Sequence, residues 1–552
     1  MSFNIASLLR THAHERPEQR AVVYPWTRDD RGHIAWTHLS FRALDQLSDE
    51  YARGLMVRGL RKGDRVSLLV TPCLELIPLV FAIFKVGALP VLIDPGMGRK
   101  RFLSCLARME PKALVGVAKA QAVRTLFPGA FSSVRLNVTV GRHTGWWGGV
   151  TLEELRVRDD RPLEPVSTAA DDEAAILFTS GSTGPAKGVV YTHGIFRAQT
   201  DFIQRMYGIE AGEIDLACFP LFGLFSVGLG MTVVVPELDP AKPAQADPAK
   251  LVDAIVEQGC TQAFGSPAIW KNVAAYCEPR GLRLPTLRRI LMAGAPVPAR
   301  LHRSFRSILA PGAEVHTPYG ATESLPVATL GSNEVLSETA EKSASGAGTC
   351  VGHPAPEMLI RIIRITDAPI ARWEEVEELP TGEIGEICVR GPVVTPRYED
   401  EPEATAAAKI AEGEHTVHRM GDVGYLDAAG RLWFCGRKRH RVELAGQTLF
   451  SVPVEAIFDA HPDVFRSALV RTHGEPGIAV QLEKQCQRRP DVIAQELFAL
   501  GAEHAHTKDI HRIYFNADFP VDVRHNAKIH REQLGAWADA QSPHVPKSRE
   551  KA

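Results

Sequence analysis

The sequence predicts an α/β protein with parallel sheets, followed by a smaller α+β part at the carboxyl end. A strand, a helix and a strand succeed one another between residues 65 and 93, which is the βαβ pattern of a parallel sheet. After about residue 350, β segments follow one another without long helices between them. A length of 552 residues also predicts two to four domains, at about 150 residues each.

Amphipathic periodicity predicts two early helices, one over residues 6–13 and one that begins after Ser40 and ends near Gly59. Short apolar runs predict strands over residues 65–70, 88–93, 174–178, 214–219, 232–235, 262–264 and 289–292. Glycine-rich loops follow several of these strands. Ligand loops lie at the carboxyl ends of strands in open α/β sheets, so we expect a binding site there.

The second half of the chain predicts strands over 359–365 and 385–390 and a hairpin over 421–434. We expect an N-terminal domain of residues 1–436 and a C-terminal domain of residues 437–552. Residues 331–350 are rich in Ser, Gly, Ala and Glu, which predicts a mobile surface loop.

Composition excludes several classes of protein. The formal charge is -2, from 63 basic and 65 acidic residues, so no global field attracts nucleic acid or an anionic membrane. Nine cysteines without a CxxC pair predict free thiols in a reducing compartment. The apolar stretch 74–93 contains Glu75, Lys85 and two prolines, which disfavours a transmembrane segment. With no signal peptide at the start, these features predict a cytoplasmic protein.

The strongest chemical signal is TSGSTGPAKG, residues 179–188, directly after the apolar run 174–178. Its hydroxyls and glycine amides can surround a triphosphate, because glycine lets the backbone approach closely. Lys187 would add a positive charge to the phosphate oxygens. The segment is not a Walker A loop, and a flexible linker would not usually follow a buried strand.

Two weaker signals follow. In YGATE, residues 319–323, an aromatic face can pack on a base, a hydroxyl can meet phosphate, and Glu323 can hold Mg²⁺. Asp422 can accept from ribose hydroxyls, and Arg437 can reach ribose or phosphate. Each string alone also fits an ordinary turn, and a lone Lys528 also fits a solvated surface residue.

Together and in this order, the strings resemble the adenylate-forming superfamily of acyl-CoA synthetases, peptide-synthetase adenylation domains and luciferases. The resemblance covers about residues 8–534, and its further motifs are KVGALPVLIDP (85–95), GEIGEICVRGP (382–392), GDVGYLD (421–427) and GRLWFCGR (430–437). It implies the adenylate-forming enzyme fold, with layered sheets and a β-rich subdomain in the N-terminal region. It also implies that residues 437–552 form a small mobile lid with a hinge near Arg439.

The resemblance implies ATP and Mg²⁺ as cofactors. The implied ATP-binding residues are Thr179, Ser180, Gly181, Ser182, Thr183, Gly184, Lys187, Gly294, Ala295, Pro296, Tyr319, Gly320, Thr322, Asp422 and Arg437. The implied catalytic residues are Lys187, Glu323 and Lys528. Glu323 would be the metal ligand, and Lys528 would bridge the substrate carboxylate and the α-phosphate during adenylation.

The sequence departs from the superfamily at four places. The hinge has Arg439 where Asp or Lys is usual, and Met420 replaces a common Thr. Gly223 stands where an aromatic residue or His commonly gates the acyl pocket, so the gate is open or is supplied by Phe222 or Phe225. Asn526-Ala527-Lys528 replaces the usual Ser-Gly-Lys. The hinge, gate and terminal changes weaken the expectation of a thioester-forming step with CoA.

The whole pattern, and VDVRHNAKI at 521–529 in particular, most resembles the β-lactone synthetases of bacterial long-chain olefin biosynthesis. This implies an AMP-forming ligase of lipid metabolism that activates a long-chain 2-alkyl-3-hydroxy fatty acid. The 3-hydroxyl group then attacks the acyl-adenylate, which needs no second substrate, and a β-lactone, AMP and pyrophosphate result. The implied partners are a reductase and an α/β-hydrolase-fold decarboxylase of the same pathway.

Several alternatives stay open. A long-chain acyl-CoA synthetase is one, and a non-catalytic ATP-binding scaffold is another, although a scaffold needs neither Glu323 nor Lys528. The basic run 437–441 could be a nucleic-acid patch, but the chain is not basic overall. His193 is expected to orient the phosphate loop or to cap a helix. The apolar segments 222–231 and 264–270 are expected to line a substrate tunnel or to form plain core.

Overall fold

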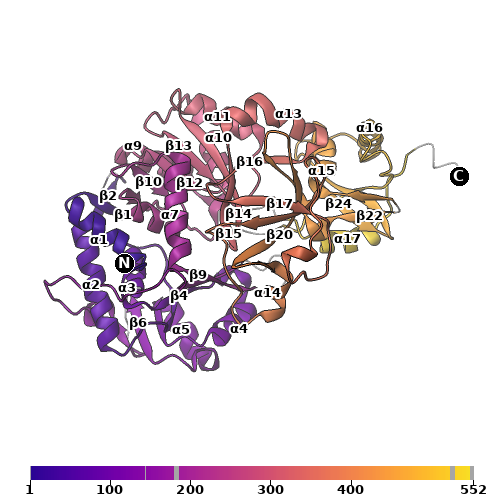
Figure 1. Ribbon diagram of the computed structural model, residues 1–552. Helices are drawn as coiled ribbons and strands as arrows, with labels where there is room; N and C mark the ends of the chain where they lie inside the picture. Colours follow the sequence, from indigo (N-terminus) through magenta and orange to yellow (C-terminus); the bar gives the residue numbers. More distant parts are fainter. Residues whose placement is uncertain are drawn as a thin grey trace.

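The computed structural model describes residues 2–30, 32–142, 145–179, 186–444, 446–521 and 529–546. Among these residues the strands form sheets of fourteen, seven, three and two strands. Figure 1 shows the chain progressing from the indigo N-terminal region, through the large sheets, to the yellow C-terminal segment at the opposite end. The structure therefore confirms the predicted α/β class.

The seven-stranded sheet carries the first predicted βαβ unit. Its order is β7 (Val150–Thr151), β6 (Leu136–Val140), β5 (Ala113–Val117), β3 (Arg65–Leu69), β4 (Leu89–Leu92), β8 (Glu173–Phe178) and β9 (Gly188–Thr192). Neighbours are parallel except for β8 and β9, which are antiparallel. The segment between β8 and β9 is thus a hairpin connection, and it is the segment that the sequence predicts to bind phosphate.

The fourteen-stranded sheet has a parallel part, with β2 antiparallel at its edge, and an antiparallel part. Its parallel part comprises β1 (Arg20–Arg28), β11 (Thr232–Val234), β10 (Ile214–Ala217), β12 (Gln262–Gly265), β13 (Arg289–Met292) and β14 (Glu314–Ala321). Its antiparallel strands are β2 (Ile34–Ser40), β15 (Ser324–Gly331), β16 (Thr349–Pro354), β17 (Leu359–Ile363), β18 (Gly385–Arg390), β19 (Lys409–Glu412), β20 (His415–Leu426) and β21 (Leu432–Arg437). The predicted hairpin over 421–434 is β20–β21.

Helices cover both large sheets, and α7 stands between them in Figure 1. The principal helices are α1 (Ala6–Glu15), α2 (Phe41–Val57), α3 (Leu76–Val86), α4 (Arg99–Met109), α5 (Ala118–Leu126), α7 (His193–Tyr207), α8 (Gly223–Gly228), α9 (Pro248–Gln258), α10 (Pro267–Cys277), α11 (Ala299–Ile308), α14 (Pro402–Ala408), α15 (Ser451–Asp459), α16 (Pro490–Ala502) and α17 (Arg531–Asp539). Ser40 caps α2, which begins directly after it as predicted, because its side chain accepts from the Ala43 N–H at 3.2 Å.

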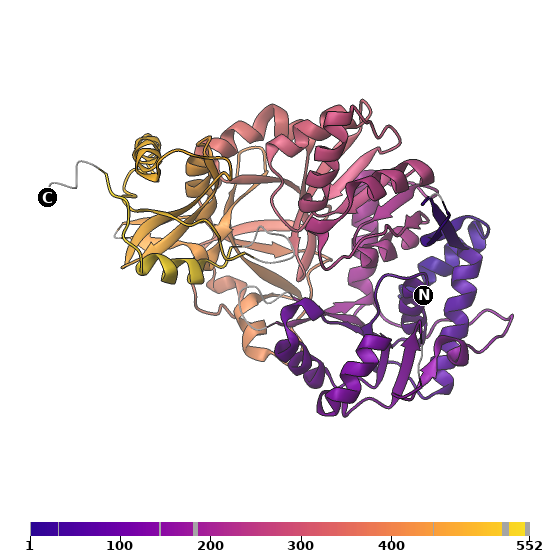
Figure 2. The same ribbon diagram turned by 180° about the vertical axis from the view of Figure 1, so that it is seen from behind.

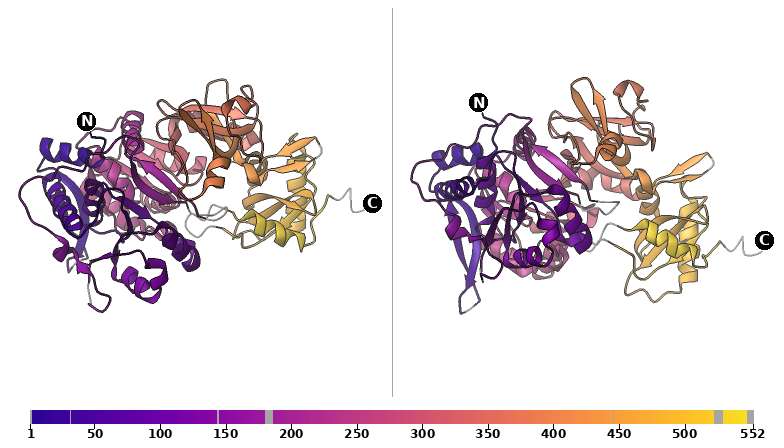
Figure 3. Two further views of the ribbon diagram at one scale, coloured as in Figure 1. Left: turned by 60° about the horizontal axis from the view of Figure 1, so that its bottom comes forward. Right: turned by 90° about the horizontal axis from the view of Figure 1, so that it is seen from below.

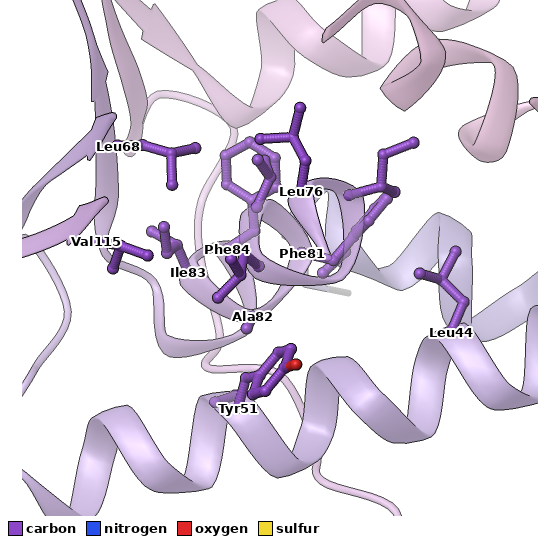
Figure 4. Close-up of a cluster of buried hydrophobic side chains, with 14 of the residues drawn as sticks. Leu44, Tyr51, Leu68, Leu76, Phe81, Ala82, Ile83, Phe84 and Val115 are labelled. Atoms are coloured by element: carbon purple, nitrogen blue, oxygen red, sulfur yellow. The ribbon is translucent and has the colours of Figure 1, made fainter. Parts of the chain in front are cut away.

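The helix α3 is buried on every side, which explains why its sequence is apolar around its whole circumference. Figure 4 shows α3 between α2, which carries Leu44 and Tyr51, and the sheet residues Leu68 and Val115, with Ile83 on the side of the sheet. Among the described residues, no helix is long and apolar enough to cross a membrane.

Lys85 is a charged residue inside this apolar helix, and its side chain is fully buried. Its ammonium group donates to Asp45 Oδ1 at 2.6 Å and also contacts Asp49. Arg10 binds the same two carboxylates, at 2.6 and 2.9 Å. The cluster therefore ties α1, α2 and α3 together with two cations on two anions.

We expect Lys85→Met to lower the stability by about 3–5 kcal/mol, since it leaves two buried carboxylates with one cation. Thermal unfolding followed by circular dichroism measures the loss. Lys112→Met is the matched control, because the Lys112–Asp64 pair leaves the lysine side chain 43% exposed and contributes less than about 1 kcal/mol. Equal shifts in melting temperature for the two variants would contradict the structural role of Lys85.

The described strands after Arg437 form separate small sheets. β22 (Val442–Leu444) pairs with β23 (Gln447–Leu449), while β24 (Val464–Thr472), β25 (Glu475–Leu482) and β26 (Ile513–Phe515) form the three-stranded sheet. With α15, α16 and α17 they make up the yellow segment, which protrudes at one end in Figures 2 and 3.

The prediction of a surface loop over residues 331–350 is wrong. Two short helices, α12 (Ser332–Glu334) and α13 (Ala340–Lys342), alternate there with π-helical turns. Arg431 bonds both Glu334 and Glu338, at 3.0 and 2.7 Å, from the neighbouring β-hairpin. Val335 packs against Trp433 beneath them, so tertiary contacts stabilise a helix that the polar composition does not indicate.

Candidate active site

The two ends of the predicted phosphate loop are fixed to each other. The Thr179 N–H donates to the Lys187 carbonyl at 3.0 Å, and the Lys187 N–H donates to Thr179 Oγ1 at 3.2 Å. Residues 180–185 lie outside the described part of the chain, so the predictions for Ser180, Gly181, Ser182, Thr183 and Gly184 remain predictions.

The Lys187 side chain extends from the end of the predicted phosphate loop toward an aromatic ring. Its Nζ lies 4.7 Å from the ring centroid of Tyr398. The backbone around Tyr398 pairs with β9, since Glu399 N–H donates to the Gly188 carbonyl. The Lys187 ammonium group therefore lies on the Tyr398 ring, close to the carboxyl end of β8.

The motif YGATE occupies the end of β14 and the turn into β15. Gly320 is required there, because a Cβ atom would lie 2.7 Å from the Ser324 carbonyl oxygen. The Tyr191 hydroxyl, from β9, donates to the Thr322 carbonyl oxygen at 2.6 Å. This bond joins the two large sheets next to the two predicted phosphate contacts, Lys187 and Thr322.

Glu323 is held by Tyr398 and Thr395, and the Thr395 backbone N–H is one of the donors, at 2.9 Å from the Glu323 carbonyl oxygen. The Tyr398 hydroxyl donates to Glu323 Oε1 at 2.6 Å, and Thr395 Oγ1 donates to the Glu323 carbonyl oxygen at 3.0 Å. Burial and the nearby Glu323 charge raise the pKa of Tyr398, so the phenol stays a donor. Within the described residues, Glu323 Oε2 accepts no such bond, which leaves it available to a cation.

Asp422 and Arg437 face each other across the β20–β21 hairpin. Arg437 Nη1 lies 2.8 Å from Asp422 Oδ1, and the Tyr319 hydroxyl donates to Oδ2 at 2.6 Å. Burial raises the pKa of Asp422, while the Arg437 guanidinium and the Tyr319 hydroxyl oppose that shift. A buried carboxylate with fixed partners on both oxygens is a preformed acceptor for hydroxyl groups.

One cavity of about 2220 Å³ joins these residues. Of the predicted site, the described residues that line it are Thr179, Lys187, Gly294, Ala295, Pro296, Tyr319, Gly320, Thr322, Glu323, Asp422 and Arg437. Residues that follow Arg437 line it as well, among them Glu455, Arg466 and Arg531. The cavity therefore reaches from the carboxyl ends of β8, β13 and β14 to the C-terminal segment.

The apolar segments 222–231 and 264–270 were expected either to line a substrate tunnel or to form core. Residues of both line the cavity. Phe222, Phe225 and Phe264 line it, and the rings of Phe222 and Phe264 stack with centroids 4.0 Å apart. Trp270 is instead fully buried core. Gly223 has a packing reason, because a Cβ atom there would lie 2.8 Å from a methyl group of Val233.

Two other expectations have outcomes in the structure. His193 neither caps α7 nor contacts the described ends of the phosphate loop: its Nδ1 accepts from the Ile5 N–H at 3.2 Å, and Thr192 caps the helix.

The basic run 437–441 is ion-paired, with Lys438 on Glu386 at 3.0 Å and Arg441 on Asp367 at 2.7 Å. Lys528 lies outside the described residues, so its role remains a prediction.

Sequence reasoning missed four polar residues of this region: Tyr191, Tyr398, Lys409 and His418. The tyrosines bond the YGATE turn, as described above. Lys409 is buried and donates from Nζ to Thr395 Oγ1 at 3.3 Å. His418 lines the cavity on the same strand as Asp422. Its position on the strand of Asp422 was the one sequence signal that could have indicated His418. Tyr191, Tyr398 and Lys409 lie outside the motifs of the sequence analysis.

The family model for the AMP-binding enzyme matches residues 9–399, which is most of the chain. The chain belongs to the AMP-binding enzyme family. Other members of this family are similar over nearly the whole length. The olefin beta-lactone synthetase of Xanthomonas campestris pv. campestris is 45% identical over 558 residues, covering 98% of both chains. That of Stenotrophomonas maltophilia is 45% identical over 551 residues, again covering 98% of both. The predicted resemblance is confirmed.

Solved structures of this AMP-binding fold agree. The amide bond synthetase McbA from Marinactinospora thermotolerans superposes with a TM-score of 0.77 at 23% identity, covering 97% of this chain and 99% of that one. ATP-bound MatB from Rhodopseudomonas palustris gives 0.77 at 20% identity, covering 98% and 99%. These two establish the fold of this AMP-binding enzyme, and it is the adenylate-forming fold that the motifs predicted.

Proposed function

We propose that the protein uses ATP and Mg²⁺ to activate a long-chain 2-alkyl-3-hydroxy fatty acid as its acyl-adenylate. The substrate's own 3-hydroxyl group then closes a β-lactone, and AMP leaves. The observation that carries this proposal is the 45% identity to two olefin beta-lactone synthetases over 98% of each chain. The large cavity with its wall of phenylalanines supports a long-chain substrate.

The geometry supports separate residues for the ribose, the adenine and the phosphates of ATP. Asp422, flanked by Tyr319 and Arg437, accepts from the ribose hydroxyls, and the loop of Gly294, Ala295 and Pro296 lies along the adenine. Lys187 and Thr322 contact phosphate. Each assignment uses a donor or acceptor that the fold already holds in place, which lowers the cost of ordering the site on binding.

Mg²⁺ fits the residues present. Glu323 offers Oε2 while Tyr398 fixes Oε1, and no cluster of three or more metal-ligating side chains occurs among the described residues. Mg²⁺ commonly uses one or two carboxylates together with substrate phosphates rather than a full protein cage. Bound there, the ion would neutralise charge on the phosphates.

We further propose that residues 437–552 act as a lid that turns near Arg439.

A CoA-free assay tests the proposal. Incubated with a 2-alkyl-3-hydroxy long-chain acid, ATP and Mg²⁺, the protein should yield a β-lactone, AMP and pyrophosphate, detected by mass spectrometry. The matched control is the same acid without its 3-hydroxyl group. It should stop at the adenylate, because no internal nucleophile is present. Removing Mg²⁺ with EDTA should abolish pyrophosphate release with both acids.

A second candidate function is a long-chain acyl-CoA synthetase. The long-chain-fatty-acid–CoA ligase of Thermus thermophilus is 28% identical over 425 residues, covering 76% of this chain and 75% of that protein. Turnover that requires CoA, accepts the plain acid equally well and gives a thioester would establish this candidate in place of the first.

A further inference from the structure

We propose that His418 is the catalytic base that takes the proton from the substrate's 3-hydroxyl group as the β-lactone ring closes. The inference rests on the proposed function and assigns a residue to the step that distinguishes it from thioester formation. His418 lies on β20, four residues before Asp422, and it lines the cavity although its side chain is almost fully buried.

A hydrogen bond fixes which ring nitrogen can accept a proton. His418 Nδ1 lies 3.1 Å from the Ala408 carbonyl oxygen. A carbonyl oxygen can only accept, so Nδ1 carries the hydrogen and Nε2 keeps its lone pair. Within the described part of the chain, the bond to Ala408 is the one that this ring makes. The remaining nitrogen of a cavity-lining imidazole is therefore an acceptor without a protein donor.

The surroundings keep the imidazole neutral. Lys409 is its cross-strand partner on β19, and Lys187 approaches from the phosphate loop. Burial lowers the pKa of His418, and the positive charges of Lys409 and Lys187 lower it further. Burial also lowers the pKa of Lys409, to about 7, and the nearby Glu323 opposes that shift. A neutral imidazole is the form that a base requires.

A chain of contacts connects His418 to the reacting end of the site. Glu323 follows Thr322, which the superfamily resemblance implies as the contact of the α-phosphate. Thr395 donates to the Glu323 carbonyl oxygen at 3.0 Å, and Lys409 donates to Thr395 at 3.3 Å. Lys409 pairs directly with His418 across the strands. The acyl group is joined to the α-phosphate, so the hydroxyl group that must attack it lies on this side of the cavity.

The other basic groups near this end are already engaged. Asp422 has Arg437 on one carboxylate oxygen and Tyr319 on the other. Glu323 accepts from Tyr398 and is the proposed ligand of Mg²⁺. Lys187 faces the ring of Tyr398 and serves phosphate. Among the groups named in these contacts, His418 is the one that none of these roles uses.

The proposed step balances without a further reactant. The hydroxyl proton passes to His418 Nε2 while the hydroxyl oxygen bonds to the acyl carbon. The bond from that carbon to the AMP phosphate oxygen breaks, and its electron pair leaves with AMP. The imidazolium that results is unfavourable beside Lys409 and Lys187, so it returns its proton to water.

The test separates the two half-reactions in the variant His418→Gln. ATP–pyrophosphate exchange, which reports adenylation, should stay within about threefold of the parent. Lactone formation should fall by about 10²–10⁴-fold, the usual contribution of a general base. With enzyme in stoichiometric amount, the acyl-adenylate should then accumulate and be visible by mass spectrometry. The retained exchange activity also shows that the variant folds.

His193→Gln is the matched control, because His193 is equally buried and also makes one hydrogen bond to the backbone. It should change exchange and lactone formation by the same factor. If His418→Gln lowers both activities together, or leaves lactone formation unchanged, the assignment is wrong. If the parent protein forms no lactone at all, the proposed function fails instead, so the two failures are distinguishable.

Discussion

Replacing Lys528 by alanine should reduce the rate of adenylate formation by about 10²–10³-fold, the cost of removing one donor that stabilises transition-state charge. The reaction brings a carboxylate anion against a polyanion, and the role that we predict for Lys528 is to neutralise both as the proposed lid closes. Because this contact belongs to the transition state, kcat should fall while the KM for ATP changes little. ATP–pyrophosphate exchange measures the effect.

Lys484→Ala is the matched control, since Lys484 is an exposed lysine of the same C-terminal segment. Its exchange rate should equal that of the parent. Equal rates for Lys528→Ala and the parent would refute the role of Lys528, and a rise in the KM for ATP without a fall in kcat would assign the lysine to ATP binding instead.

Local patterns predicted eleven of the 26 described strands and the motifs that line the cavity. Apolar runs of four to six residues, such as Arg289–Met292, became β strands because they are buried on both faces. The phosphate loop and the YGATE turn were recognisable because their chemistry is contained in consecutive residues. The burial of α3 agrees with its sequence, whose apolar residues leave no polar face, but we did not predict it.

Contacts between distant segments were not predictable in this way. Tyr398 is bonded to Glu323, 75 residues away, and Arg431 is bonded to Glu334, 97 residues away. The strand β20 adds a second obstacle. Its register against β18 shifts between Glu386 and Cys388, and Gly421 has a φ of 65°. The irregularity lies between His418 and Asp422 and interrupts the alternation of faces, so their spacing of four residues alone did not establish that both face the cavity.

The Asp422 carboxylate supplies the last prediction. In Asp422→Asn the charge that pairs with Arg437 is lost, and one of the two acceptors for the ribose hydroxyls becomes a donor. A hydrogen bond to a charged group contributes about 1.5–3 kcal/mol, so the KM for ATP should rise by about 10–10²-fold. Initial rates of pyrophosphate exchange over a range of ATP concentrations measure this change.

Asp427→Asn is the matched control. Asp427 lies just beyond the same strand and makes the same kinds of contact, with Arg431 at 2.8 Å and with the indole N–H of Trp433 at 2.9 Å. It does not line the cavity. The control should therefore lower the melting temperature without changing the KM for ATP. If both variants raise that KM equally, Asp422 acts by supporting the hairpin and not by binding ribose. A rise confined to Asp422→Asn would mean that the fixed Tyr319–Asp422–Arg437 contact is the receptor for the nucleotide.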